Sequence, residues 1–163
     1  MSSFERFLMR HFPYKVAEGA DGPYLRRWTL AEWRGRAVYL HHFIGDDTNT
    51  DLHDHSRRFV SVGVKGAYIE HTAQGARVWR APWVRTFPAT HAHRLTLATP
   101  SAWTLVGVGR MERRSGFLVK NKHIRAGAYR LSQLLQHSER VKARRHAAQG
   151  DTACDTTPTS RSA

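Results

Sequence analysis

The chain has 163 residues and a mass of 18.6 kDa, a size that suits a single domain and leaves little room for a second. Its 40% hydrophobic content is sufficient for a buried core, and no apolar stretch is long enough for a transmembrane helix. The 26 Lys and Arg residues outnumber the 13 Asp and Glu residues, so a net charge of +13 favours anionic partners, unless it only reflects an arginine-rich proteome.

Cysteine usage and the first residues of the chain bear on its location. Cys154 is the single cysteine and lies in a polar segment, which excludes a disulfide framework and a thiolate metal cluster. The first ten residues carry an acid and two arginines and lack the apolar run of a secretory signal. We therefore expect a cytoplasmic protein with no membrane partner.

The N-terminal segment has a helical pattern. Apolar side chains recur at helical spacing in residues 3–12, which predicts a short amphipathic helix. Pro13 ends this helix, and Gly19 and Gly22 predict a loop. We therefore assign residues 1–23 to an N-terminal helix and loop.

From residue 24 the pattern changes to that of short strands. Runs rich in Val, Trp, Phe, Tyr and Thr alternate with Gly, Pro and polar turns, and no alternation of strands with helices is visible. The predicted strands are residues 25–33, 36–44, 58–65, 67–72, 76–80, 83–87, 92–98, 102–109 and 113–119. The sequence therefore predicts an all-β sandwich or barrel over residues 24–120.

The C-terminal part has a different composition. Residues 127–148 carry a thin stripe of Leu and Val, and the rest of this segment is basic, which predicts a helix within residues 121–148. This basic helix either docks on the barrel or serves as an interaction helix. Residues 149–163 are small and polar, so we expect a disordered tail.

The placement of the 11 histidines points to a metal site. Two pairs have His-x-His spacing, namely His53 with His55 and His91 with His93. On a strand, side chains at positions i and i+2 point to the same face, so each pair can present two imidazoles to one ion. Neutral imidazole suits zinc, iron, copper or nickel. Two such pairs on strands that can be neighbours in a barrel predict a histidine metal site.

The residues around these pairs resemble the two motifs of the cupin superfamily. His53, His55 and Gly66 fall at the spacing of the first motif, and Pro88 and His93 fall at that of the second. The resemblance covers about residues 36–118 and implies a double-stranded β-helix, or jelly-roll, barrel. The chain is also similar to a group of small bacterial and phage cupins with a His-Asp-His motif. It shares with them His53, Asp54, His55, Phe59, Gly66, Tyr68, Glu70, His93, Arg94, Trp103, Thr104 and Leu105.

The sequence departs from the usual cupin ligand set. The Glu of the first motif would stand at Phe59, and the Asp of the narrower group would stand at Arg58. The resemblance therefore implies a site of three histidines, His53, His55 and His93, similar to that of thiol dioxygenases and some other cupin oxygenases.

Other residues are candidates for roles around this site. Strand parity allows Asp51, Glu70 or His91 as a fourth ligand, although each more often lies behind the ligands or in solvent. Asp54 faces the other side of its strand, and we expect it to hold an Arg or backbone amides.

Three further side chains are candidate catalytic residues. Arg58 can anchor a carboxylate or phosphate, Tyr68 either lines the pocket or packs in the core, and Glu70 can point inward.

The resemblance implies a divalent metal cofactor and a small-molecule substrate. A three-histidine set leaves open positions on the ion, and the resemblance favours Fe(II), with zinc, manganese and nickel as alternatives. We therefore expect a metal-dependent cupin enzyme, an Fe(II) oxygenase or dioxygenase that acts on a small anionic molecule. The resemblance also implies a homodimer.

Two other functions remain open. One is a non-catalytic cupin that binds a metal or small ligand as a sensor or accessory protein. The other is a nucleic-acid-associated protein that uses the arginine-rich surface and the basic helix. The sequence has no serine nucleophile elbow, phosphate-binding loop or dinucleotide fingerprint, which disfavours serine hydrolases, nucleotide triphosphatases and Rossmann enzymes.

Overall fold

The computed structural model describes residues 2–19, 22–47, 51–120, 122–133, 135, 138 and 139. The chain divides into two compact units, Met1–Ala126 and Gly127–Ala163. In the second unit the described residues are helical, whereas most of the predicted helix beyond residue 133 and the predicted tail, with Cys154, lie outside the described residues. No helix in the described part of the chain is long and apolar enough to cross a membrane.

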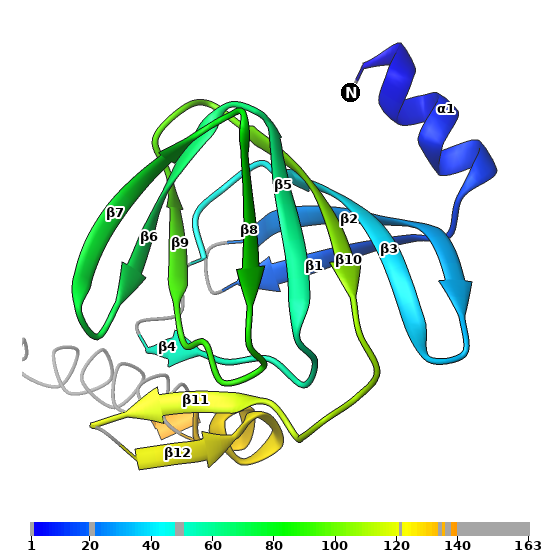
Figure 1. Cartoon of the computed structure of the whole chain (residues 1–163). Coiled ribbons are helices and arrows are strands. Elements are labelled where there is room, and N and C mark those ends of the chain that lie inside the picture. The colour runs from blue at the N-terminus through cyan, green and yellow to red at the C-terminus, as the bar shows by residue number, and fades with distance from the viewer. Residues whose placement is uncertain are drawn as a thin grey trace, which may run out of the picture. The chain divides into compact units, whose positions relative to one another are not determined.

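The first unit consists of one helix followed by short strands (Figure 1). Nearly every strand predicted from the sequence is present within two or three residues of its expected limits. The elements are α1 (Ser3–His11), β1 (Tyr14–Gly19), β2 (Gly22–Trp33), β3 (Arg36–Phe43), β4 (Leu52–His53), β5 (Phe59–Lys65), β6 (Ala67–Thr72), β7 (Gly75–Arg80), β8 (Trp83–Phe87), β9 (Arg94–Leu97), β10 (Ala102–Val108), β11 (Gly116–Val119) and β12 (Lys122–Arg125).

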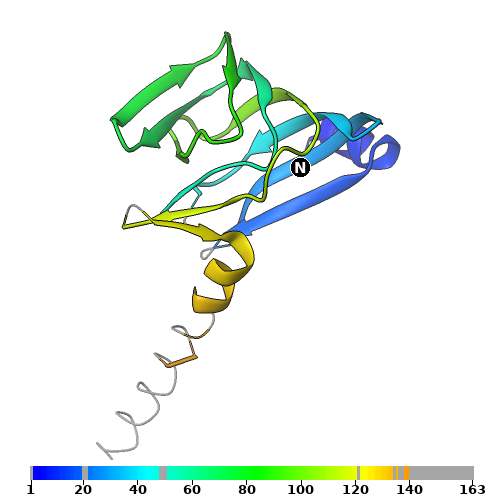
Figure 2. The same cartoon turned by 60° about the horizontal axis from the view of Figure 1, so that its bottom comes forward.

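The strands form three antiparallel sheets. The largest has the order β1-β2-β3-β10-β5-β8, and the two smaller ones have the orders β7-β6-β9 and β12-β11-β4. A β-bridge between His53 and His93 joins the two smaller sheets, so that they form a second layer opposite the large sheet. Figures 1 and 2 show β6 and β7 on the opposite side of this unit from β1 and β2. This arrangement confirms the predicted all-β jelly-roll barrel.

Tight turns depend on glycine at one position in particular. Gly66 separates β5 from β6 and has a φ of 80°, which L-residues with side chains rarely adopt. A Cβ atom there would lie 2.2 Å from the carbonyl oxygen of Ser101. Only glycine therefore allows the chain to pass from the large sheet to the small one at this point, as the predicted turn requires.

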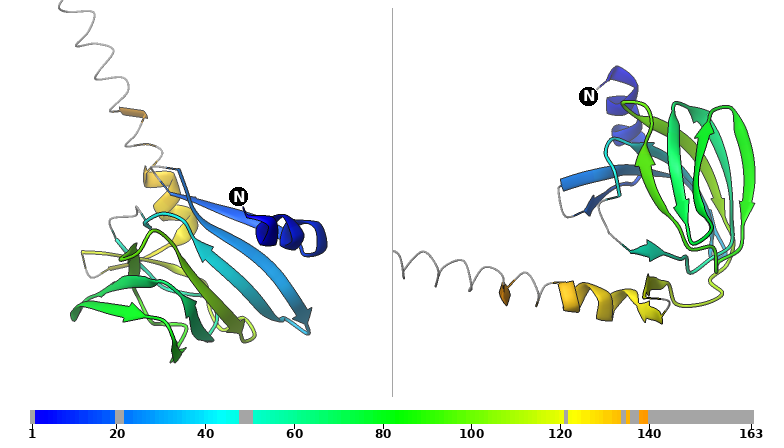
Figure 3. Two further views of the ribbon diagram at one scale, coloured as in Figure 1. Left: turned by 90° about the horizontal axis from the view of Figure 1, so that it is seen from above. Right: turned by 90° about the vertical axis from the view of Figure 1, so that its left-hand side faces the viewer.

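The outer face of the large sheet is covered in part by α1, which lies beside β2 and β3 and away from β6 and β7 (Figure 3). His42 stacks on Trp103 with ring centroids 4.0 Å apart, and Trp103 stacks on the fully buried Trp28 at 5.8 Å. Phe4 of α1 contacts the same Trp103 ring at 5.9 Å. These aromatic contacts form an apolar surface against which the helix packs.

Polar contacts of Glu5 hold α1 against this apolar surface. One carboxylate oxygen accepts a hydrogen bond from the backbone N–H of Ser2 at 2.7 Å, which caps the helix. The other accepts from Arg26 Nη1 at 2.6 Å and lies 2.9 Å from His42 Nδ1. Burial by itself would raise the pKa of Glu5, but these contacts outweigh it and lower the pKa to about 2.

Three strands were not predicted. Residues 14–19 form β1 rather than a loop, because all of them pair with the first half of β2, from Gly22 to Trp28. The two residues of β4 are held by pairing with β11, and β12 lies where the basic helix was expected to begin. In each case the partner strand decides the conformation, since the local sequence has too little alternation to indicate a strand.

The ion pairs of Glu5 predict an acid-sensitive contribution to stability. Replacement Glu5→Gln should lower the free energy of unfolding near neutral pH by about 2 kcal/mol, because it leaves the partly buried Arg26 and the buried His42 without a carboxylate partner. Since the folded pKa lies below the ordinary value of 4.5, the contribution is complete above pH 4.5 and is lost as the pH falls toward 2.

Urea unfolding at several pH values measures this difference. The control is Glu18→Gln on β1, an exposed carboxylate, for which the change should stay within about 0.5 kcal/mol. A Glu5→Gln variant as stable as the wild-type protein at pH 7 would contradict the role given to Glu5.

Candidate metal centre

A cavity of about 260 Å³ lies between the large sheet and the second layer. Ten of its nineteen lining residues are aromatic or aliphatic, and nine are polar or charged. The lining residues are Tyr24, Leu25, Arg27, Tyr39, His41, Phe43, Asp47, His53, His55, Ser56, Arg57, Phe59, Tyr68, Phe87, His93, Leu95, Thr104, Val106 and Val108. A cavity that combines apolar walls with convergent polar groups is typical of a small-molecule site.

The backbone brings the two predicted histidine motifs together. The N–H of His53 donates to the carbonyl of His93, and the N–H of His93 donates to the carbonyl of His53, both at 2.9 Å. The N–H of His55 donates to the carbonyl of Ala89 at 3.0 Å. The segment after β4 therefore runs against the segment before β9, so that all three predicted ligands reach the same end of the cavity.

The three imidazoles have a spacing that suits one ion. Nε2 of His55 lies 3.0 Å from Nε2 of His93, and one ring nitrogen from each of His53, His55 and His93 lies within 4.8 Å of the other two. Two nitrogens each about 2.1 Å from an ion, at a right angle, are about 3.0 Å apart. The spacing of His55 and His93 therefore fits a single divalent ion, and His53 is close enough to be a candidate third ligand.

Protonation also favours metal binding. Burial lowers the pKa of His55 to about 2, and burial lowers that of His93 to about 4 even though Glu70 opposes the shift. Both rings are therefore neutral near pH 7, which is the form that binds metals.

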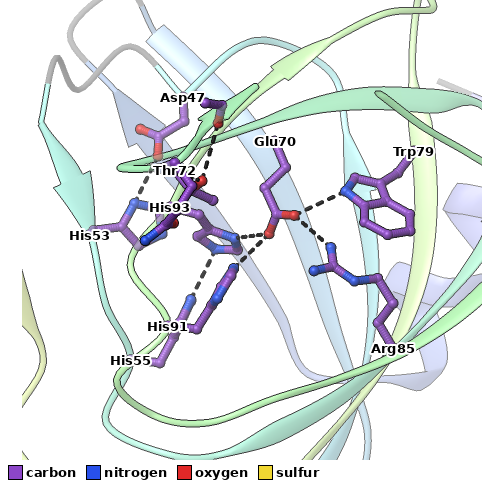
Figure 4. Close-up of polar contacts among 11 residues, drawn as sticks. Asp47, His53, His55, Glu70, Thr72, Trp79, Arg85, His91 and His93 are labelled. Atoms are coloured by element: carbon purple, nitrogen blue, oxygen red, sulfur yellow. Dashed lines mark hydrogen bonds and ion pairs between the residues drawn. The ribbon is translucent and has the colours of Figure 1, made fainter. Parts of the chain in front are cut away.

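Two of the three predicted ligands each have a carboxylate close to their ring nitrogen Nδ1, as Figure 4 shows. Nδ1 of His93 lies 2.9 Å from Oε1 of Glu70, so it carries the proton and leaves Nε2 free to bind an ion. Nδ1 of His53 lies 3.0 Å from Oδ2 of Asp47, although the N–H is not aligned for a good hydrogen bond. The backbone N–H of Asp47 donates to the carbonyl of Leu95 on β9, which places this carboxylate beside His53.

Glu70 is the centre of a buried polar network. Oε1 also lies 2.7 Å from Nε2 of His91, and Oε2 accepts from Trp79 Nε1 at 2.9 Å and from Arg85 Nη1 at 2.5 Å. Burial would raise the pKa of Glu70, but the hydrogen bonds from His91, His93 and Arg85 hold it well below its ordinary range. Glu70 is therefore a fixed carboxylate that orients His93.

Arg85 is itself held in place by aromatic rings. Its guanidinium carbon lies 3.8 Å from the centre of the Trp79 ring and 4.4 Å from that of Phe87. The cation is thus enclosed between two ring faces while it donates to Glu70. The network behind His93 has little freedom to rearrange.

The residues considered as a fourth ligand take other positions. Glu70 does not line the cavity, and His91 bonds to it, so that Glu70, His91 and His93 form a second group with metal-binding spacing. Asp51 belongs to neither group. Asp47, four residues earlier, has the place beside the histidines for which Asp51 was considered, because a side-chain position in a loop does not follow strand parity.

The predicted catalytic residues also take different positions. Tyr68 lines the cavity, and burial raises the pKa of its hydroxyl above the ordinary value, so it keeps its proton. Arg58 does not line the cavity; it is exposed and pairs with Glu112. The prediction placed Arg58 near the metal because it stands where related sequences have an acid, but Arg58 lies just before β5 and its side chain is exposed. Its neighbour Arg57 lines the cavity instead.

Asp54 has the structural role that the sequence indicates. Its side chain is buried and accepts hydrogen bonds from the backbone N–H of Gly116 at 2.6 Å and from Arg113 Nη1 at 2.7 Å. It also lies 3.0 Å from Nε2 of His123 on β12. Asp54 therefore ties the segment between His53 and His55 to β11 and β12.

Comparison with known proteins identifies the fold. No family model and no curated protein matches the sequence. A crystal structure of Fe(II) HppE aligns over 61% of this chain and only 57% of its own, with a TM-score of 0.52 and 10% identity. A sugar phosphate isomerase of the cupin superfamily from Silicibacter pomeroyi aligns over 67% and 78%, with a TM-score of 0.51 and 16% identity. This protein has a cupin-type fold.

A third solved structure is also similar in fold. A structure of Streptomyces PAC13 with uridine aligns over 68% of this chain and 87% of its own, with a TM-score of 0.52 and 9% identity. Phe59 stands where the resemblance to cupins placed the usual ligand Glu. Its ring lies edge-on to His55 at 4.7 Å and stacks on Phe87 at 4.6 Å. The position expected for a fourth ligand is therefore part of an apolar wall.

The position of Glu70 predicts a loss of metal affinity in Glu70→Gln. The amide is isosteric, but it no longer holds the proton on Nδ1 of His93 with a full negative charge, so affinity for a divalent ion should fall by about 10- to 100-fold. Competition with a chromophoric chelator measures this affinity.

The matched control is Glu112→Gln, which removes the carboxylate of the exposed Arg58 pair and should leave the affinity unchanged. Equal affinities in Glu70→Gln and wild-type protein would mean that Glu70 does not position His93.

Proposed function

We propose that this protein is a metal-dependent cupin enzyme in which His53, His55 and His93 hold Fe(II), and that it oxygenates a small molecule. The observation that carries the proposal is the convergence of three imidazoles, two of them backed by carboxylates, at one end of the cavity. A facial set of three neutral ligands leaves positions open on the ion for a substrate and for dioxygen.

The residues of the chain have separate tasks in this proposal. Glu70 keeps the proton on Nδ1 of His93, so that Nε2 of this ring stays available as a ligand. Asp47 places a negative charge 3.0 Å from Nδ1 of His53. Phe59 and Phe87 exclude water from one side of the cluster. Tyr68, protonated and facing the cavity, donates a hydrogen bond to a polar group of the substrate. Bound Fe(II) supplies the redox chemistry.

The choice of iron follows from the resemblance to cupin oxygenases, because the ligand set alone suits several metals. Three imidazoles suit iron, zinc and nickel, and manganese is a weaker fit because it prefers oxygen ligands. The absence of a carboxylate among the predicted ligands distinguishes the site from the two-histidine, one-carboxylate arrangement of many Fe(II) oxygenases. The similarity in fold to Fe(II) HppE is in keeping with iron but does not extend to residues, since identity is 10%.

The metal site predicts the result of single-ligand replacements. In His53→Ala and His93→Ala, the content of bound metal after isolation without added metal should fall from about one ion per chain to less than about a tenth. Elemental analysis of the purified protein measures the content. The control is His71→Ala on β6, whose ring bonds to Thr96 and lies outside the cluster.

The outcome separates the proposal from its alternatives. Stoichiometric iron that persists in both ligand variants would place the metal elsewhere and exclude the three-histidine site. Metal bound through these histidines with no oxygen uptake, against a panel of thiols, amino acids and organic acids, would indicate a non-catalytic ligand-binding cupin. Binding to nucleic acid with a steep dependence on salt would favour the third alternative, a nucleic-acid-associated protein.

A further inference from the structure

A row of polar side chains crosses the floor of the cavity opposite the histidine cluster. Strand pairing places His41 of β3 between Arg27 of β2 and Thr104 of β10. All three line the cavity, because side chains at directly paired positions point to the same face of a sheet. Polar groups side by side on an otherwise apolar wall indicate a place where a polar part of a ligand binds.

His41 has a ring nitrogen that needs a partner. Its Nε2 is shielded from solvent and has no hydrogen-bond partner among the described residues. The ring is fixed between Tyr39, on which it stacks at 6.0 Å, and Phe43, which meets it edge-on at 5.9 Å. A buried polar atom without a partner is costly, so a rigid one in a cavity wall points to a hydrogen bond that a ligand completes.

Arg27 supplies positive charge beside this nitrogen. Its guanidinium lies 4.7 Å over the Tyr39 ring, and no carboxylate of the described residues lies within ion-pair distance of it. Arg57, the other cavity arginine, donates to the carbonyls of Gly35 and Gly109. Asp47 is the acidic residue that lines the cavity, and its carboxylate lies beside His53. Arg27 is therefore the cavity cation best placed to meet an anion from outside the chain.

We propose that this row is an anion subsite, in which Arg27 binds the carboxylate, phosphonate or phosphate group of a small organic acid and His41 and Thr104 hydrogen-bond its oxygen atoms. This inference rests on the proposed function, because the subsite would hold the anionic end of a substrate whose other end lies toward His53, His55 and His93. A guanidinium suits such groups because it binds two oxygens at once.

The surroundings limit the size and chemistry of this acid. The cavity of about 260 Å³ lies just below the usual range for drug-sized ligands, so the acid is a small molecule. Leu25 and Phe43 lie on one side of the row, and Tyr39 and Val106 lie on the other. These apolar walls lower the local dielectric and strengthen the attraction between Arg27 and an anion.

The test uses the full chain loaded with Zn(II) as a redox-inert ion, with acetate and methylphosphonate as probes. Calorimetry at fixed, near-physiological ionic strength measures the dissociation constant of each probe. The wild-type protein should bind at least one of them, and the preferred probe distinguishes a carboxylate from a phosphonate or phosphate substrate. In Arg27→Gln the binding should weaken by at least about tenfold, with the zinc content unchanged.

Two further variants sharpen the result. His41→Phe keeps an aromatic ring but removes the ring nitrogen, and binding should weaken several-fold; His41→Gln serves if the Phe variant does not fold. The matched control is Arg34→Gln, which removes an exposed arginine whose guanidinium similarly lies 4.9 Å over a ring, that of Trp33. Its affinity for the probes should equal that of the wild-type protein.

Each result decides the proposal. Probe binding that is unchanged in Arg27→Gln, as expected if the anion bound only to the metal or to the general positive charge, overturns it. Failure of the zinc-loaded wild-type protein to bind either probe also overturns it. If the protein binds no metal but binds a probe in an Arg27-dependent way, the anion subsite stands and the proposed metal-dependent function fails.

Discussion

The reciprocal backbone pairing of His53 with His93 is the constraint on which the candidate site depends. It joins β4 to the segment before β9 and so closes the two smaller sheets into one layer. His55 and His93 are 38 positions apart, and without this pairing their rings would have no fixed relation. With this pairing, the Nε2 atoms of His55 and His93 lie 3.0 Å apart, a spacing that suits the proposed metal site.

A buried carboxylate adds a second constraint. Burying Glu70 is unfavourable by itself, and four donors compensate for it: His91, His93, Trp79 and Arg85. These donors come from β7, β8 and the segment before β9, so the network links three parts of the fold around one charge. The carboxylate of Glu70 contacts a histidine of the candidate site, while an aromatic ring, that of Phe59, occupies the position where the resemblance placed a carboxylate ligand.

The large sheet carries separate polar sets on its two faces. His41 and His42 are neighbours on β3, yet one faces the cavity and the other stacks on Trp103 and contacts Glu5 of α1. Strand alternation makes this division unavoidable. His42 on the outer face holds α1 against the sheet and contributes to stability, whereas His41 on the inner face, with Arg27 and Thr104, is available to a ligand.

The sequence by itself determined the all-β class, most of the strands and the three histidines, because alternation and His-x-His spacing are local and survive without knowledge of the partner strands. It did not reveal β1, β4 or β12, which exist through pairing. Only the tertiary structure decided that Asp47 stands beside His53, and that Arg27 and not Arg58 faces the cavity. Strand register and chain closure bring such groups together, and these depend on contacts between residues far apart in the sequence.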